Sequence, residues 1–158
     1  MTDLKVTARM VRWAAESMAF NLSQLPPDKL DWKPNPASKS ALQIVGEVVG
    51  VMRMMLPMFQ GGNFEMQPGP ELANLDEAQR LLAETSEEFA VALEAAGGTL
   101  ERLVDLPFGQ LWGSYAVTFG MIDLVHHHGQ ITYIQSLLGD AENHMDMPSV
   151  LRWFGPPQ

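Results

Sequence analysis

The stretch 114–138, SYAVTFGMIDLVHHHGQITYIQSLL, is predicted to form one long helix that contains three of the four histidines of the chain. Residues four apart lie on one face of an α-helix, so Asp123 and His127 point the same way. A carboxylate and an imidazole on a core-facing stripe need polar partners, because burying an unpaired charge is costly. The remaining residues of that stripe are mostly small or apolar, which is typical of a helix packed on a core: Ala116, Phe119, Gly120, Gln130, Ile131, Ile134 and Leu138.

Upstream of this helix, three further helices are predicted over about 2–25, 40–59 and 75–96. Pro26-Pro27 ends the first, and Ser40 followed three residues later by Gln43 is a capping box that opens the second. Asn74 with Glu77 gives a similar start to the third. In its interior, Ala78, Leu82, Phe89 and Leu93 are expected to face the core.

The remaining segments are predicted to be connectors. Residues 99–113 contain Pro107 and Gly109 and are expected to form a linker with a short helical turn, while 148–154 is predicted to form one short helix near the C-terminus. Trp32 in the first linker is expected to pack over the core. The sequence therefore predicts an all-α protein: a single domain over 1–158, built as a four-helix bundle whose long connectors permit crossovers.

Composition narrows the classes of partner. The formal net charge is −9 and the pI is about 4.7, which argues against nucleic acid and anionic membranes as partners, since both recruit clusters of Lys and Arg. The absence of cysteine excludes disulfides, thiolate zinc sites and a cysteine nucleophile. No secretory signal is apparent at the N-terminus, and the apolar stretch 41–59 is interrupted by Glu47, Arg53 and Pro57, so we expect a cytoplasmic protein without a membrane span.

Three segments together resemble the DinB/YfiT-like superfamily of four-helix bundles. They are LPPDKLDWKPNPASKSALQIVGEVVG after the first helix, DLVHHHGQITYIQSLLG in the fourth helix, and the terminal LRWFG. Proteins of this superfamily typically hold a metal on three histidines, one from the second helix and two, four apart, from the fourth helix just before a Gly-Gln pair. Aligned on Gly129-Gln130, the resemblance places His127 and Asp123 at the last two ligand positions, and it places Glu47 at the first.

The sequence thus departs from the family pattern, because carboxylates replace two of the three histidines. Asp and Glu oxygens also bind zinc, and more oxygen ligands shift the preference toward harder ions such as manganese or iron(II). The resemblance therefore implies a divalent ion, whether zinc, nickel, manganese or iron, held by Glu47, Asp123 and His127 between the second and fourth helices. The sequence does not identify a catalytic side chain.

Each of these residues also has a purely structural interpretation. Glu47 could lie at the edge of the buried face and reach water, or pair with a histidine of the fourth helix. Asp123 could orient His127 through a hydrogen bond without binding metal. His126 is an alternative ligand or a packed interface histidine, and Gln130 either bonds a ligand or substrate or serves helix packing alone. His128 is expected to make a surface or interface polar contact, and His144 to be exposed.

Two functions remain open. The resemblance implies a metal-dependent hydrolase or thiol S-transferase that activates water or a thiol and acts on a small molecule, with a low-molecular-weight thiol as second cofactor in the transferase. The alternative is a family member that has lost catalysis and acts as a small-molecule-binding or dimeric interaction module. The resemblance also makes a homodimer the expected assembly.

Overall fold

A computed structural model describes residues 4–142 and 144–156 of the chain and confirms the predicted all-α bundle. The predicted start of the first helix at Thr2 lies outside the described residues. Two single turns of 3-10 helix, Pro27–Lys29 and Gly97–Leu100, lie in the connectors. The α-helices are α1 (Leu4–Ser23), α2 (Ala41–Phe59), α3 (Leu75–Ala95), α4 (Gly113–Leu137) and the short α5 (Met147–Phe154).

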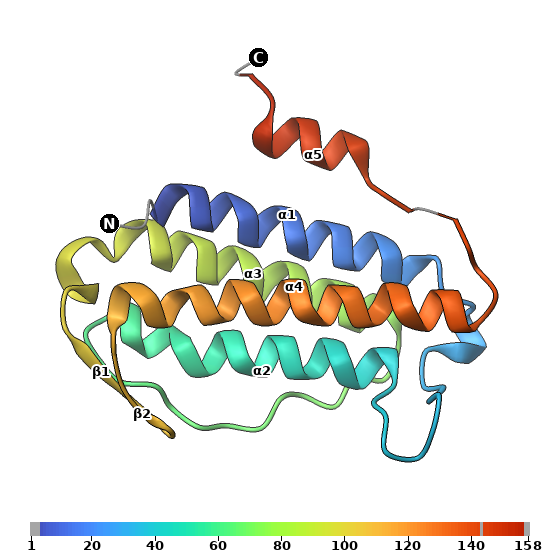
Figure 1. Cartoon of the computed structure of the whole chain (residues 1–158), viewed down its shortest axis with the longest axis horizontal. Coiled ribbons are helices and arrows are strands. Elements are labelled where there is room, and N and C mark those ends of the chain that lie inside the picture. Colours follow the sequence, from blue (N-terminus) through green and yellow to red (C-terminus); the bar gives the residue numbers. More distant parts are fainter. Residues whose placement is uncertain (1–3, 143, 157–158) are drawn as a thin grey trace.

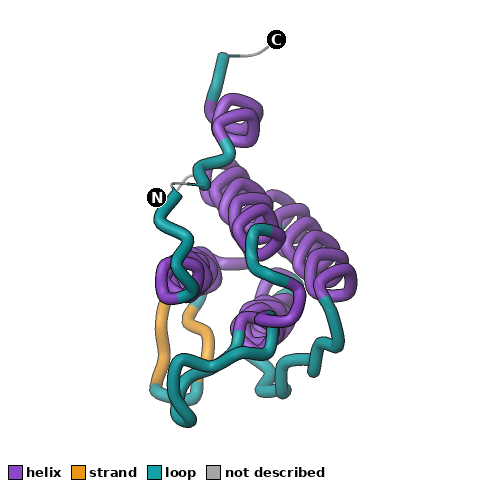
Figure 2. Tube along the Cα trace, turned by 90° about the vertical axis from the view of Figure 1, so that its right-hand side faces the viewer, coloured by secondary structure: helices purple, strands orange, loops and turns teal. Residues whose placement is uncertain are grey.

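The four long helices are not joined in simple up-and-down order. Figure 1 shows α1 and α4 running in one direction and α2 and α3 in the other, so the loop 60–74 must cross the length of the bundle between two parallel helices. Helix α1 packs mainly against α3 and α4, and α2 packs against the same two helices. Viewed from the side of the molecule, the helices surround a common core, with α5 lying apart beyond α1 (Figure 2). This arrangement places α2 directly beside α4.

The crossing loop lies directly on α2 at two glycines. A Cβ atom on Gly46 would lie 2.4 Å from the carbonyl oxygen of Pro70, and one on Gly50 would lie 2.7 Å from the Cα of Gly69. Both distances are shorter than any real contact, so only glycine permits this approach. The loop therefore forms a wall beside α2, directly next to Glu47.

The start of α2 is fixed as predicted. Ser40 accepts a hydrogen bond from the backbone N–H of Gln43, whose side-chain oxygen in turn accepts from the Ser40 backbone N–H. This capping box places Lys39 immediately before the helix and Glu47 two turns into it. At the start of α3, Asn74 likewise accepts from the Glu77 backbone N–H.

The connector before α4 contains a β-hairpin where a linker with a helical turn was predicted. Strands β1 (Leu103–Leu106) and β2 (Gly109–Trp112) pair antiparallel, with Leu106 opposite Gly109. Gly109 has a φ of +137°, which only glycine adopts readily. The prediction was wrong here because each strand is only four residues long and β2 shows no clear alternation of buried and exposed side chains.

The core is formed by one cluster of apolar side chains from all four helices, and it includes Ala78, Leu82, Phe89 and Leu93, which are fully buried as predicted. Trp32 packs against this cluster. Helix α2 is long and apolar enough to cross a membrane by composition, but most of it is buried inside the bundle, as in a core helix. One residue predicted to lie on the buried stripe of α4 is in fact exposed. Phe119 is 43% exposed and lies beside the hairpin, where its ring centroid is 6.1 Å from that of Phe108.

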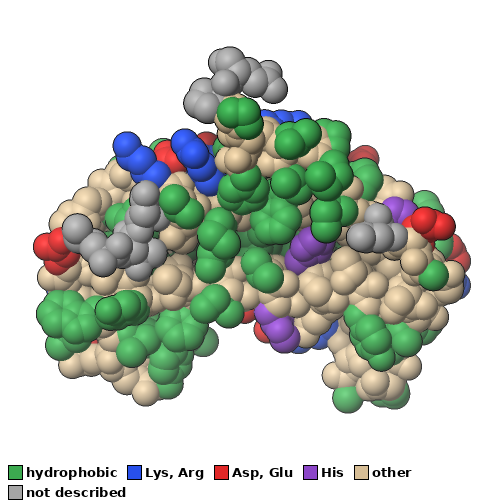
Figure 3. All heavy atoms as spheres, turned by 45° about the horizontal axis from the view of Figure 1, so that its top comes forward, with side chains coloured by type: hydrophobic (Ala, Val, Ile, Leu, Met, Phe, Trp, Pro, Cys, Tyr) green, Lys and Arg blue, Asp and Glu red, His purple; other side chains and the backbone are tan. Residues whose placement is uncertain are grey.

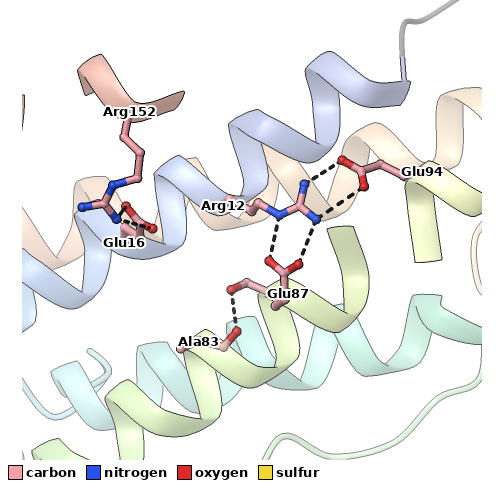
Figure 4. A network of polar contacts seen from close by, with 7 residues as sticks. Arg12, Glu16, Ala83, Glu87, Glu94 and Arg152 are labelled. Carbon is pink, nitrogen blue, oxygen red and sulfur yellow. Dashed lines mark hydrogen bonds and ion pairs between the residues drawn. The ribbon is translucent and has the colours of Figure 1, made fainter. Parts of the chain in front are cut away.

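Helices α1 and α3 are joined by an arginine clamp. The Arg12 guanidinium donates to both carboxylate oxygens of Glu87, at 2.7 and 2.9 Å, and to Glu94 at 2.7 Å (Figure 4). These hydrogen bonds raise the pKa of Arg12, so the group stays charged. Nearby, Arg152 donates to Glu16 at 3.1 Å and connects α5 to α1. The clamp and this second ion pair fix α1 as one wall of the bundle.

Candidate functional site

Asp123 and His127 lie one turn apart on the inward face of α4. The Nε2 atom of His127 is 3.4 Å from Oδ1 of Asp123. The histidine is 5% exposed, whereas the Asp123 side chain is 27% exposed and reaches the edge of the bundle. The predicted pair is therefore formed, with a buried imidazole facing a partly hydrated carboxylate.

Glu47 reaches the same histidine nitrogen from α2. Its Oε2 atom is 3.5 Å from His127 Nε2, and about a third of its side chain is exposed. The structure therefore places Glu47 and Asp123, two of the three residues that the family resemblance assigned to a metal site, beside the same nitrogen of the third, His127. Glu47 lies at the edge of the buried face, as one of its structural interpretations held, and it also pairs with a histidine of α4.

Lys39 is a member of this cluster that the sequence analysis did not identify. Its ammonium group forms an ion pair with Oε2 of Glu47, the same oxygen that faces His127. The only available sequence signal was a lysine placed just before the capping box, about two helical turns from Glu47. The ammonium group of Lys39 and the imidazole of His127, which can be protonated, thus share one carboxylate oxygen of Glu47.

Gln130 fixes the orientation of the His127 ring. Nδ1 of His127 lies 2.6 Å from Oε1 of Gln130, and the amide nitrogen of Gln130 lies 3.1 Å from Nε2 of His126. An amide oxygen only accepts, so Nδ1 carries a proton, while the amide nitrogen donates to His126. Nε2 of His127 is consequently the atom presented to the two carboxylates. Gln130 therefore acts through His127. His126 is exposed and contacts the amide nitrogen of Gln130.

The surroundings raise the pKa of His127 despite its burial. Burial of the ring by itself lowers the pKa, but the hydrogen bonds to Asp123 and Gln130 and the negative charges of Asp123 and Glu47 outweigh it. The protonated ring is therefore favoured between the two carboxylates. A proton and a metal ion compete for the same Nε2 lone pair.

The donor set agrees with a divalent ion in chemistry and in two separations. With metal–ligand bonds of about 2.1 Å, donors around a tetrahedral ion lie about 3.4 Å apart, and the two carboxylate oxygens lie 3.4 and 3.5 Å from His127 Nε2. Within the described residues, however, no group of three or more His, Asp or Glu side chains is already arranged to hold a metal ion. Glu47 is turned toward Lys39, so it must rotate to bind an ion together with Asp123 and His127.

A cavity of about 620 Å³ opens beside Glu47, between α2 and the crossing loop. Lys39, Gln43 and Glu47 line one side of it, and residues 69–72 line the other. Its size is that of a small-molecule site. Asp123 and His127 do not line this cavity, so Glu47 is the residue that connects it to the histidine.

The other two histidines lie on the opposite side of α4, toward α1. His128 is half-buried, and Nδ2 of Asn21 lies 3.1 Å from its Nε2, which confirms the predicted interface contact. Burial lowers the pKa of His128, so its ring is held neutral. His144, expected to be exposed, is half-buried instead, because its Nε2 pairs with Asp140 at 2.7 Å.

Comparison with known proteins agrees with this architecture. The model of the DinB family matches residues 1–157, and the chain belongs to that family. Among solved structures, the chain is similar to the DinB-like protein YjoA of Bacillus subtilis, with a TM-score of 0.69 and 18% identity over 87% of this chain and 94% of the other. At this identity the likeness shows the fold. No curated protein matches the chain significantly.

Proposed function

We propose that this DinB family protein is a metal-dependent enzyme of the hydrolase or thiol S-transferase type. The observation that carries the proposal is that one carboxylate oxygen of Glu47 and one of Asp123 both lie within 3.5 Å of Nε2 of His127, so a rotation of Glu47 away from Lys39 would let one ion reach all three groups. A divalent zinc, nickel, manganese or iron ion held there would lower the pKa of a bound water or thiol. Three protein donors leave open positions for that group.

The surrounding residues have separate roles in this proposal. Gln130 holds the His127 ring with Nε2 toward the carboxylates, a form of support that is common for metal-binding histidines. The cavity of about 620 Å³ receives a small-molecule substrate and, in the transferase, a low-molecular-weight thiol. Lys39 lines the cavity and, once Glu47 turns away, offers an ammonium group to an anionic part of the substrate.

One observation favours the alternative, a family member that has lost catalysis and binds a small molecule without metal. The Lys39 ammonium forms an ion pair with Glu47, so the negative charge of this carboxylate is compensated without a metal ion. In that case Lys39, Glu47, Asp123 and His127 form a stable network of charges. The pocket beside it would remain usable for binding alone.

We also propose that the protein forms a homodimer through an exposed face formed by α4 and the neighbouring hairpin. Apart from its three histidines, Asp123 is the only residue of this 25-residue helix with an ionisable acidic or basic side chain other than tyrosine, and it faces His127. Six large apolar side chains of this face are 43–72% exposed, and a contiguous apolar patch of this kind is typical of a protein interface. Figure 3 shows hydrophobic side chains gathered at the hairpin end of the molecule. The face comprises Phe108, Trp112, Tyr115, Phe119, Ile122 and Val125.

This surface suits a second copy of the chain, because an uncharged face matches itself under two-fold symmetry. Sedimentation of Phe119→Glu should show a monomer, whereas Val91→Glu, at an equally exposed position on α3, should remain dimeric. A monomeric wild-type protein at high micromolar concentration would contradict the proposal. The acidic composition is consistent with a cytoplasmic protein that binds neither nucleic acid nor membranes.

Elemental analysis of untagged protein purified without chelator tests the metal-dependent function. Near-stoichiometric divalent metal is expected in the wild type and in the control His144→Ala, and it should be lost in Glu47→Ala and His127→Ala. Protein that stays metal-free after incubation with zinc, nickel, manganese and iron(II) would reject the metal-dependent enzyme and favour the binding module.

A further inference from the structure

The ion pair between Lys39 and Glu47 joins the histidine cluster to the cavity beside Glu47. The Lys39 ammonium group contacts Oε2 of Glu47, and the same oxygen lies 3.5 Å from Nε2 of His127. Both Lys39 and Glu47 line the cavity, whereas His127 does not. An ammonium group and a divalent ion on one carboxylate repel each other. Glu47 can therefore pair either with Lys39 or with an ion held at His127, and each pairing disfavours the other.

A competing charge can open this ion pair. The side chains of Lys39 and Glu47 are 49% and 36% exposed, and an ion pair so open to water contributes little net free energy. The backbone beside Lys39 is held by the capping box of Ser40, so only the lysine side chain has to move. Its ammonium group therefore remains at the wall of the cavity after it releases Glu47.

A released Lys39 needs a new anionic partner. Within the described part of the chain its one ion pair is that with Glu47, and no other cationic side chain among those residues lines the cavity. Asp31 and Glu71 also line the cavity, but they are exposed to water and form no ion pair with Lys39. One ammonium group beside two further carboxylates suits a ligand with a single negative charge better than a phosphate dianion.

We propose that Lys39 couples metal binding to the binding of a small carboxylate ligand in this cavity. The divalent ion takes Glu47, and the released ammonium group binds the carboxylate of the ligand. Leu42, Val51 and Met54 offer an apolar surface to the rest of the ligand. The ion and the ligand then strengthen the binding of each other by the same factor. This coupling rests on the metal site proposed above, and it makes small carboxylates the substrate class of that site.

The first measurement uses the metal-free full chain, so it does not depend on metal binding. Titration of ¹⁵N-labelled protein with benzoate is followed by NMR, with the uncharged benzamide as the matched probe. Glu47→Gln frees Lys39 from its charged partner and should strengthen benzoate binding by roughly fivefold. Glu71→Gln removes a carboxylate of the same cavity that does not contact Lys39, and it should have a much smaller effect. Lys39→Met should weaken benzoate binding to the level of benzamide.

The second measurement is the affinity for zinc, determined by competition with a chromophoric chelator. Lys39→Met removes the cation that competes for Glu47, so zinc should bind roughly fivefold more tightly. Lys33→Met, at an exposed position in the same connector, should leave the zinc affinity unchanged. Saturating benzoate should strengthen zinc binding by roughly fivefold in the wild type and should not do so in Lys39→Met.

The two measurements separate failure of the coupling from failure of the metal site. Normal zinc binding that neither Lys39→Met nor benzoate alters would overturn the coupling and leave the metal-dependent function intact. Enhancement by benzoate that persists in Lys39→Met would also overturn it, because the carboxylate would then bind the ion directly. If no variant binds zinc, the metal site and the coupling both fall, and equal effects of Glu47→Gln and Glu71→Gln in metal-free protein would reject Lys39 as the carboxylate-binding group as well.

Discussion

His127 and His128 are neighbours in the sequence, yet α4 places them in opposite chemical surroundings. His127 faces two carboxylates from α2 and α4, and its pKa is raised; His128 faces the amide of Asn21 on α1, and its pKa is lowered. Both rings are largely removed from water, so burial alone does not explain the difference. The partners supplied by the neighbouring helix determine whether the ring is charged or neutral.

The largest expected difference between the side of α4 that carries His127 and the side that carries His128 is in metal binding. His127→Ala should weaken divalent-ion binding by more than about 100-fold, since loss of an orienting partner alone typically costs 10–100-fold and this change removes a ligand. His128→Ala should leave the affinity unchanged. Competition with a chromophoric chelator measures both, and equal losses would show that the division between the two sides is wrong.

A smaller effect is expected when the His127 side loses only its orienting residue. Gln130→Leu removes the acceptor for Nδ1–H, so the ring is free to turn, and metal affinity should fall by roughly 10- to 100-fold. Gln110→Leu, on the exposed hairpin, is a suitable control. Unchanged affinity in Gln130→Leu would assign Gly129-Gln130 to helix packing alone.

On the His128 side, the corresponding effect is on stability. Asn21→Ala leaves the carbonyl oxygens of Ser17 and His144 and the ring of His128 without their shared donor, and should lower the free energy of unfolding by about 1–3 kcal/mol. Urea denaturation measures this change. The neighbouring exposed Ser23→Ala should cost much less, and an equally small cost for Asn21→Ala would show that the His128 side is not held by this amide.

The smallest effects are the two titrations themselves. In metal-free protein, the midpoint of the His127 Cε1–H signal should lie above the ordinary value of about 6.5 and that of His128 below it. NMR with His→Gln variants for assignment measures both. A reversed order, or one common midpoint, would remove the basis of the comparison.

Opposite dependences of stability on pH follow from these directions. Because the folded-state pKa of His127 is raised, its contribution to stability is complete below the unfolded value and is lost as the pH rises through the folded value. The contribution of His128, whose folded pKa is lowered, is present above the unfolded value and is lost as the pH falls. His127→Gln should therefore destabilise metal-free protein more at pH 6 than at pH 8.

The affinity for a metal ion should weaken as the pH falls, since protons compete with the ion for Nε2 of His127.

Much of the fold could be predicted from local signals, because these helices begin and end at residues with a direct effect on the backbone. The capping box at Ser40 and the cap at Asn74 fixed two helix starts to within a residue. The hairpin was missed because four-residue strands leave too short a pattern. Phe119 was misplaced because α4 is apolar on both its buried and its exposed face, so periodicity could not separate them.

The site could be predicted only in part. Glu47, Asp123 and His127 were predicted as metal ligands through the family resemblance; helix packing places both carboxylates near His127, and metal binding by the three stays a prediction. Lys39 was missed because its contact with Glu47 depends on how the chain enters α2, which no residue spacing specifies.

Because the crossing loop contacts α2 at Gly46 and Gly50 through its backbone, substitutions in the loop and substitutions in the histidine cluster can occur independently in evolution. The groups proposed for chemistry lie on α2 and α4, whereas one wall of the cavity beside Glu47 is a loop that touches α2 through its backbone. Substitutions at 71 and 72 alter the shape of that wall without moving a donor atom of the histidine cluster. Changes in the loop can therefore alter which ligands fit the cavity while the histidine cluster stays the same.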